Sequence, residues 1–146
     1  MASFTILGAG MMGTAFAWPL SDRGHTVRLV GTHLDRELVS SIRESGRHPK
    51  LGLSVPDGVT AHQLEELEPM LRGSDALVLG VSSAGVRWAA RQVAPYLAPG
   101  TPLGMVAKGL EWDGSRLELL PDVFLEELAA AGSAARDVAP VAVAGP

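Results

Sequence analysis

Short apolar runs alternate along this chain with segments whose apolar positions recur at helical spacing. Strands are predicted at residues 4–7, 26–30, 59–61, 76–81, 103–107 and 138–143. Helices are predicted at residues 12–23, 34–45, 64–71, 84–97 and 115–131. Strands that alternate with helices form parallel βαβ units, and continuously apolar strands fit a sheet that is covered on both faces. The predicted fold class is α/β: a doubly wound, mostly parallel sheet with helices on both faces.

The sequence also predicts where the helices end, how two prolines affect them and which of their side chains face the core. Gly24 and Gly46 follow the first two helices and are typical helix stops. Pro19 removes one main-chain hydrogen bond inside the first helix, so we expect a kink or a second segment there. Pro121 interrupts the last helix or marks its start. The inward-facing side chains predicted for the second and last helices are Leu34, Leu38, Val39 and Ile42, and Leu117, Leu120, Phe124, Leu125 and Leu128.

Composition narrows the class of protein. The 146 residues are 47% apolar and 19% charged, which indicates one globular domain over residues 1–146. Residues 47–58 contain two prolines and two glycines and are predicted as a loop with room for a short edge strand. The net charge of −4 gives no general attraction for nucleic acid, and the lack of cysteine excludes disulfides and thiolate metal sites. We expect no metal site, no signal peptide, no membrane span and a cytoplasmic location.

The first predicted strand runs into the sequence Gly8-Ala9-Gly10-Met11-Met12-Gly13, and a helix follows. This is the glycine pattern of a dinucleotide-binding Rossmann sheet, found in the context that such a turn needs. Gly8 permits the tight turn, Gly10 lets the main chain approach a pyrophosphate, and Gly13 lets helix and strand pack closely. The start of the helix offers free amides and a partial positive charge to phosphates. The alternative is an ordinary strand-to-helix turn that binds nothing.

The end of the second predicted strand bears on the choice of nicotinamide cofactor. NAD-binding domains often place an acid there, but Val30 is followed by Gly31-Thr32-His33, and Asp35 comes late enough to be interpreted as a helix N-cap. Thr32, His33 and Arg36 offer donors to a 2′-phosphate, so NADP is favoured over NAD. The alternatives are that Arg36 is a solvated helix residue and that His33 belongs to a plain surface loop.

Three later strand ends carry small or polar residues. They are followed by Gly80-Val81-Ser82-Ser83, by Ala107-Lys108-Gly109-Leu110-Glu111 and by Ala144-Gly145-Pro146. Because ligands of open α/β sheets sit beyond the carboxyl ends of the strands, these segments are candidates for the site. Lys108 suits an anionic substrate, although an exposed surface lysine is an equally simple interpretation.

The sequence as a whole resembles the NAD(P)-dependent glycerol-3-phosphate dehydrogenase family. The resemblance covers nearly the whole chain, and its Lys-Gly-Leu-Glu and His-Pro pieces are more specific than the glycine turn. The matching pieces are Gly8-Ala9-Gly10 with Gly13-Thr14-Ala15, Gly24-His25 with Val27 and Leu29, His48-Pro49-Lys50-Leu51-Gly52, Val81-Ser82-Ser83, Ala107-Lys108-Gly109-Leu110-Glu111, and Ala144-Gly145-Pro146.

The resemblance implies roles for individual residues. Met11 and Met12 would contact the dinucleotide, Thr32 would lie near the adenosine ribose, and Lys108 would touch both cofactor and phosphorylated substrate. Gly145 would line the substrate site. The cofactor-binding residues expected from pattern and resemblance together are Gly8, Gly10, Met11, Met12, Gly13, Thr32, His33, Ser82 and Lys108.

The chain also departs from the family. It has Val81-Ser82-Ser83 where the family often has Val-Pro-Ser, and Ala144 where a serine is usual. Family members carry a second, helical domain after this point, with the lysine that donates or accepts the proton. We therefore expect no catalytic residue in this chain, and little turnover by the chain alone. His25 is interpreted as structural and His62 as a surface polar residue, and the role of His48 stays open.

The leading hypothesis is a cofactor domain of an oxidoreductase that interconverts sn-glycerol 3-phosphate and glycerone phosphate with NAD or NADP. A small phosphorylated substrate is the expected partner, and a homodimer is the expected assembly. One alternative is the cofactor domain of another β-hydroxyacid-type dehydrogenase. The other is a non-catalytic nucleotide-sensing module, because one Rossmann scaffold hosts many functions.

Overall fold

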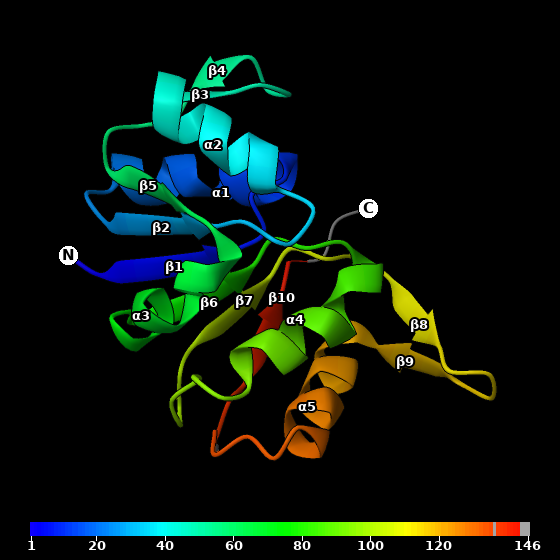
Figure 1. Ribbon diagram of the computed structural model, residues 1–146. Helices are drawn as coiled ribbons and strands as arrows, with labels where there is room; N and C mark the ends of the chain where they lie inside the picture. The colour runs from blue at the N-terminus through cyan, green and yellow to red at the C-terminus, as the bar shows by residue number, and fades with distance from the viewer. Residues whose placement is uncertain (136, 144–146) are drawn as a thin grey trace.

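A six-stranded parallel sheet forms the centre of the computed structural model, which describes residues 1–135 and 137–143 (Figure 1). The strand order is β5-β2-β1-β6-β7-β10, and every neighbouring pair is parallel. The chain starts mid-sheet, winds to one edge, returns past its first strand and winds to the other edge, so the doubly wound prediction is confirmed. The strands are β1 (Ser3–Leu7), β2 (Thr26–Val30), β5 (Val59–His62), β6 (Ala76–Leu79), β7 (Leu103–Met105) and β10 (Pro140–Ala142).

Helices cover both faces of the sheet and divide the core in two (Figure 1). One face packs against α1 (Met11–Asp22) and α2 (Arg36–Ser45), the other against α3 (Leu67–Arg72), α4 (Val86–Val93) and α5 (Leu120–Ala130). The short 3₁₀ turns η1 (Leu64–Glu66) and η2 (Ser83–Gly85) precede α3 and α4.

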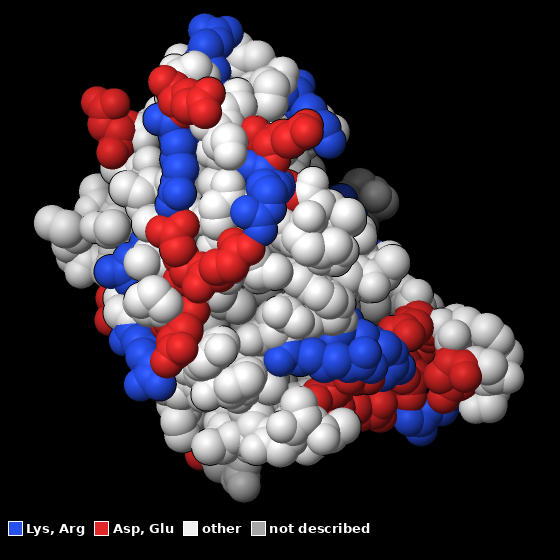
Figure 2. Space-filling model, in the orientation of Figure 1, with Lys and Arg blue, Asp and Glu red and all other residues white. Residues whose placement is uncertain are grey.

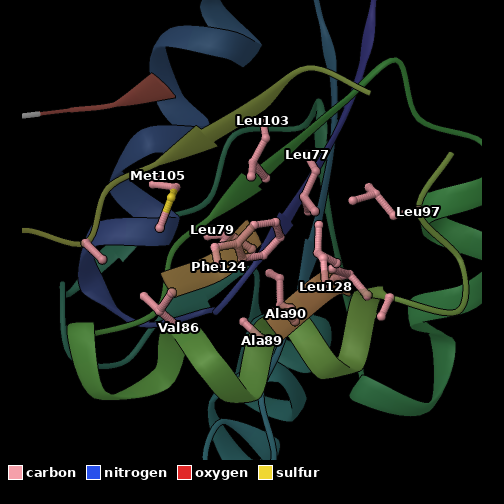
Figure 3. Close-up of a cluster of buried hydrophobic side chains, with 14 of the residues drawn as sticks. Leu77, Leu79, Val86, Ala89, Ala90, Leu97, Leu103, Met105, Phe124 and Leu128 are labelled. Atoms are coloured by element: carbon pink, nitrogen blue, oxygen red, sulfur yellow. The ribbon is translucent and has the colours of Figure 1, made fainter. Parts of the chain in front are cut away.

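The larger of the two clusters lies under α4 and α5 (Figure 3). Phe124 is fully buried between these helices and the sheet, together with Leu77 and Leu79. Burying each such side chain contributes about 1.5–3 kcal/mol, so this cluster anchors the second half of the sheet. No helix in the described part of the chain is long and apolar enough to cross a membrane.

Two small antiparallel hairpins stand apart from the main sheet. The first, β3 (Arg47–His48) with β4 (Leu53–Ser54), forms within the segment predicted as a loop. Its strands pair with each other and not with the sheet, so the expected edge strand is wrong. The second, β8 (Leu110–Trp112) with β9 (Leu117–Leu119), projects beside α4 and α5 (Figure 1).

The second hairpin corrects the predicted helix over residues 115–131. Leu117 lies on β9 and is 63% exposed, whereas its neighbour Glu118 is 7% exposed. The alternation of leucine and glutamate in Leu117–Leu119 is the two-residue period of a strand, and it competes with the helical interpretation. The helix starts at Leu120, with Pro121 in its first turn, where a proline is tolerated. Leu125 is likewise at the surface, with 36% of its area exposed.

The structure corrects the predicted start of helix α2 and excludes one of the two alternatives expected at Pro19 in α1. Helix α2 begins at Arg36 and not at Leu34, which precedes the helix and is 82% exposed. The other predicted inward residues of α2, Leu38, Val39 and Ile42, are buried as expected. Helix α1 runs as one element through Pro19, so no second segment forms there, and the expected kink stays a prediction.

Candidate functional site

The predicted site lies where β1, β2 and β6 end side by side. The main chain leaves β1 at Leu7 and turns at Gly8, whose φ of 114° is a conformation that favours glycine. The Gly8 amide donates to the carbonyl of Val30 over 2.8 Å, and the Gly80 amide donates to the carbonyl of Leu7 over 2.8 Å. The glycine turn is therefore tied to both neighbouring strands. It lies at the carboxyl ends of the strands, where ligands bind in such sheets.

A side chain would not fit at three glycines of this turn region, Gly8, Gly13 and Gly80, but it would fit at Gly10. A Cβ on Gly13 would lie 2.1 Å from the carbonyl oxygen of Gly8. A Cβ on Gly8 would lie 2.7 Å from the carbonyl carbon of Gly80, and a Cβ on Gly80 would lie 2.7 Å from the Cα of Gly13. A Cβ on Gly10 would meet no atom within 4 Å. Packing explains the first three glycines, while the missing side chain of Gly10 leaves open space at the surface.

Helix α1 starts at this open space. Gly10 is its N-cap, makes no side-chain cap, and is followed by a first turn that contains no acidic residue. The first amides of a helix have no partner within the helix, and they carry its partial positive charge. Met11 and Met12 lie in this first turn and are 53% and 59% exposed. The arrangement suits an anion such as a diphosphate.

Two hollows meet at Gly10. The first has a volume of about 430 Å³ and the second about 470 Å³. They share Gly10, Gly80, Val81 and Ser82, so they form two arms of one groove on either side of the glycine turn. The first hollow is further lined by Gly8, Thr32, His33, Leu34, Asp35, Ala84, Gly85 and Trp88, and the second by Met11, Met12, Ser83, Val106, Ala107 and Lys108.

An aromatic pair lines the first hollow. The rings of His33 and Trp88 meet edge to face, with their centroids 5.0 Å apart. His33 follows β2 and Trp88 comes from α4, so the pair bridges the ends of two elements across the groove. The sequence reasoning found His33 but missed Trp88, since a tryptophan within an apolar helix pattern gives no separate signal. Flat apolar walls of this kind suit a purine base.

Asp35 does more than precede helix α2. It occupies the N-cap position of α2, but its side chain makes no cap bond there. Its Oδ2 instead accepts from the Thr32 amide at 2.9 Å, from the Thr32 hydroxyl at 2.8 Å and from the Ala9 amide at 3.2 Å. The prediction that Asp35 stands at the N-cap position of α2 is therefore confirmed, but the expected capping hydrogen bond is absent. The carboxylate turns back toward the glycine turn instead.

The second hollow contains the other predicted site residues that the structure describes. Ser82 follows β6 and precedes η2, at the junction of the two hollows. Lys108 is exposed at the rim of the second hollow, two residues past the buried Val106. The structure thus brings Ser82, Lys108 and the glycine turn to one groove. Gly145 lies outside the described residues.

The loop that carries Lys108 leads into β8 of the second hairpin. Arginine and glutamate side chains gather in a charged network between this hairpin and helices α4 and α5 (Figure 2). Arg87 of α4 donates to Glu111 at 2.7 Å and to Glu127 at 2.8 Å, and its third contact is Glu118 at 3.5 Å. Hydrogen bonds to Glu111 and Glu127 raise the pKa of Arg87 above its ordinary value. Arg91 and Arg87, in that order of effect, lower the pKa of Glu127. The network fixes the hairpin, and hence the end of the Lys108 loop, against α4.

The histidines outside the groove have structural contacts. His25 accepts the Ala2 amide at its Nδ1 (3.2 Å) and packs against the ring of Phe4. His62 is only 17% exposed at its side chain and contacts Thr60 and Glu66, so it is less superficial than expected. His48 is fully buried, and its Nε2 lies 3.0 Å from the Ala9 carbonyl oxygen.

Curated relatives match this chain over most of its length. It is 40% identical over 114 residues to the NADP(+)-dependent glycerol-3-phosphate dehydrogenase of Archaeoglobus fulgidus, covering 77% of this chain and 33% of that protein. It is 39% identical over 132 residues to the glycerol-3-phosphate dehydrogenase [NAD(P)+] of Desulfitobacterium hafniense, covering 88% of this chain and 35% of that protein. The chain thus spans about a third of the length of these relatives.

A solved structure shares both the fold and part of the sequence. The glycerol-3-phosphate dehydrogenase of Coxiella burnetii superposes with a TM-score of 0.81 at 26% identity, covering 99% of this chain and 41% of that one. Residues 3–145 match the family described as NAD-dependent glycerol-3-phosphate dehydrogenase N-terminus. With the sequence matches, the superposed fold and the glycine turn in agreement, this chain belongs to the NAD-dependent glycerol-3-phosphate dehydrogenase family, of which it represents the N-terminal part.

Proposed function

We propose that this chain holds NAD or NADP as the cofactor domain of an enzyme that interconverts sn-glycerol 3-phosphate and glycerone phosphate. The observation that carries the proposal is the open space at Gly10, which lies at the first amides of α1 and joins two hollows. A dinucleotide has a diphosphate between two ring systems. The groove offers an anion site between two concave arms, and each arm is of a size that suits a small ligand.

Each part of the groove has a proposed role. The amides at the start of α1 hold the diphosphate, with Met11 and Met12 beside it. Thr32 and His33 in the first hollow face the adenosine, where Trp88 adds an aromatic wall. Ser82 and Lys108 line the second hollow, where the bound nicotinamide supplies hydride transfer. Lys108 also holds the phosphorylated substrate, and Gly145 is proposed to line that part of the site.

The groove bears on the choice between NAD and NADP. The name of the Archaeoglobus relative specifies NADP, in agreement with the preference drawn from the sequence. In this structure, however, the Thr32 hydroxyl donates to Asp35, and Arg36 is paired with Glu65. To bind the 2′-phosphate of NADP, Thr32 and Arg36 would have to give up their present hydrogen bonds to the carboxylates of Asp35 and Glu65. The 2′-hydroxyl of NAD, by contrast, can donate a hydrogen bond to Asp35. We therefore keep both cofactors in the proposal, to be separated by their dissociation constants.

Because this chain spans about a third of its relatives' length, we further propose that it acts within a longer protein, which carries the activity. The acid/base lysine is expected in the two-thirds of the relatives that this chain does not match, so the chain alone should bind dinucleotide and turn over little substrate. A homodimer and a cytoplasmic location are likewise proposed for the whole enzyme. Light scattering of the longer protein tests the dimer, since a monomeric mass would refute it.

The direct experiment is a titration of this chain with NADH and NADPH. Binding is read from quenching of tryptophan fluorescence, energy transfer to the reduced nicotinamide, and a rise of the unfolding temperature. A ligand at 100 times its dissociation constant stabilises the folded state by about 2.7 kcal/mol, which is readily measured. No response to either dinucleotide at millimolar concentration would refute the proposal.

Replacing Lys108 by alanine separates this enzyme from other β-hydroxyacid dehydrogenases. In the longer protein, Lys108→Ala should weaken binding of glycerone phosphate while leaving dinucleotide binding within a few-fold of the wild type. The replacement Lys50→Ala serves as the matched control, because Lys50 is an exposed lysine that lines neither hollow. Equal affinity of the Lys108 variant for the phosphorylated substrate would contradict the assignment of substrate.

A further inference from the structure

Ala9, between the first two glycines of the turn, has both its main-chain polar groups held by side chains from outside the turn. Its amide donates to Asp35 Oδ2 at 3.2 Å. Its carbonyl oxygen accepts from the Thr14 hydroxyl at 3.0 Å, and it lies 3.0 Å from Nε2 of His48. Ala9, Thr14 and His48 are all fully buried. The carbonyl therefore points into the protein, with both of its lone pairs in use.

The contacts of His48 establish which ring nitrogen carries the proton. The Leu51 amide donates to Nδ1 of His48 at 3.1 Å, so Nδ1 acts as the acceptor. The ring proton is then on Nε2, which donates to the Ala9 carbonyl. The first hairpin fixes this ring, because the Gly52 amide donates to the His48 carbonyl at 2.9 Å and the Val55 amide to the Gly46 carbonyl at 2.8 Å.

The geometry of a peptide group links this buried contact to the groove. The Ala9 carbonyl and the Gly10 amide belong to one planar trans peptide, in which they point in opposite directions. Holding the carbonyl inward therefore turns the Gly10 N–H outward, at the residue where the two hollows meet. No described residue accepts a hydrogen bond from this amide. Glycine tolerates nearly any φ, so an unheld peptide at this position is free to rotate.

We propose that His48, assisted by Thr14, is a positioning residue that aims the Gly10 amide at the diphosphate of the cofactor. His48 lines neither hollow, so the first hairpin would support the glycine turn from behind without touching the ligand itself through this side chain. The inference rests on the proposed function for the identity of the ligand, but the orientation of the peptide can be measured without any ligand.

The test compares His48→Ala with His48→Gln and with a control, His25→Ala. Glutamine restores a side-chain N–H donor at a similar reach. His25 serves as the control because it directly precedes the amino end of β2, whereas the glycine turn lies at the carboxyl ends of the strands. Affinity is measured for ADP-ribose, which contains the diphosphate, and for adenosine, which does not. We expect His48→Ala to bind ADP-ribose about tenfold more weakly, with adenosine unchanged, and His48→Gln to recover most of the loss. The control should match the wild type for both ligands.

Equal weakening of ADP-ribose and adenosine, or no weakening of either, would overturn the positioning role. If His48→Ala does not fold, Thr14→Val removes the other donor while preserving the side-chain shape, and about threefold weaker ADP-ribose binding is expected. Failure of the wild type to bind ADP-ribose would refute the proposed function and not the positioning role. In that case the amide resonances of the ligand-free protein decide. The Gly10 signal should broaden or split in His48→Ala, and an unchanged signal would refute the inference.

Discussion

Replacing Gly10 by alanine adds one methyl group and tests most sharply whether the cofactor binds in the groove. The structure predicts that this replacement weakens binding and leaves stability unchanged, whereas Gly13→Ala lowers stability. The backbone of Gly10 has φ of −64° and ψ of 179°, a conformation open to any residue, and its Cβ would meet no atom within 4 Å. Alanine lowers the entropy of the unfolded chain but is a poorer N-cap, and these two effects of about 0.5–1 kcal/mol oppose each other. Gly10→Ala should therefore fold with nearly unchanged stability.

The same methyl group should block the ligand. It would project into the space that a diphosphate needs in order to reach the first amides of α1. Each hydrogen bond between an amide and a charged oxygen is worth about 1.5–3 kcal/mol, so the loss of one weakens binding roughly 10- to 100-fold. At Gly13, by contrast, the Cβ would lie 2.1 Å from a main-chain oxygen of Gly8. Overpacking of this kind costs about 1–3 kcal/mol and should lower the unfolding temperature by roughly 3–10 °C.

The assay combines thermal unfolding by circular dichroism with titration of NADH and NADPH against wild type, Gly10→Ala and Gly13→Ala. The predicted outcome is a stable Gly10 variant with weak binding, and a destabilised Gly13 variant. If Gly10→Ala binds dinucleotide as tightly as the wild type does, the diphosphate does not lie at the start of α1. The proposed placement of the cofactor would then be refuted.

Three further predictions concern other parts of the site and the charged network. Trp88→Leu should weaken adenosine binding several-fold and remove most of the ligand-induced fluorescence quenching, whereas Trp112→Leu, on the exposed hairpin, should preserve both; equal quenching in the two variants would contradict the aromatic wall. In the longer enzyme, Lys108→Ala should raise the KM for glycerone phosphate at least tenfold, measured by steady-state kinetics; an unchanged KM would count against the assignment. Because its arginine partners hold the pKa of Glu127 below the ordinary value of 4.5, this glutamate stabilises the fold above that pH, and the stabilisation is lost as the pH falls through the lowered pKa. Glu127→Gln should therefore reduce the decline of the unfolding temperature between pH 5 and pH 3, and an identical decline would refute the role of the pair.

The sequence by itself determined the features that depend on neighbouring residues. The apolar period of two or 3.6 located most strands and helices, and the glycine pattern located the start of α1, because these signals reside in local backbone preferences. The sequence also placed Lys108 and Ser82 near the glycine turn, because the carboxyl ends of parallel strands converge on the same side of the sheet. Leu117–Leu119 were wrongly assigned to a helix, because a pattern of only three residues fits both the helical period of 3.6 and the strand period of two.

The tertiary structure alone decided which distant groups meet. The second hairpin forms where Arg87 of α4 binds Glu111 and Glu118, residues 24 and 31 positions further along the chain. Asp35 and His48 reach Ala9 across 26 and 39 residues, and neither contact leaves a periodic signal in the sequence. A single side chain can satisfy a distant main-chain group at almost any spacing, so only the folded path of the chain shows that these two residues support the glycine turn.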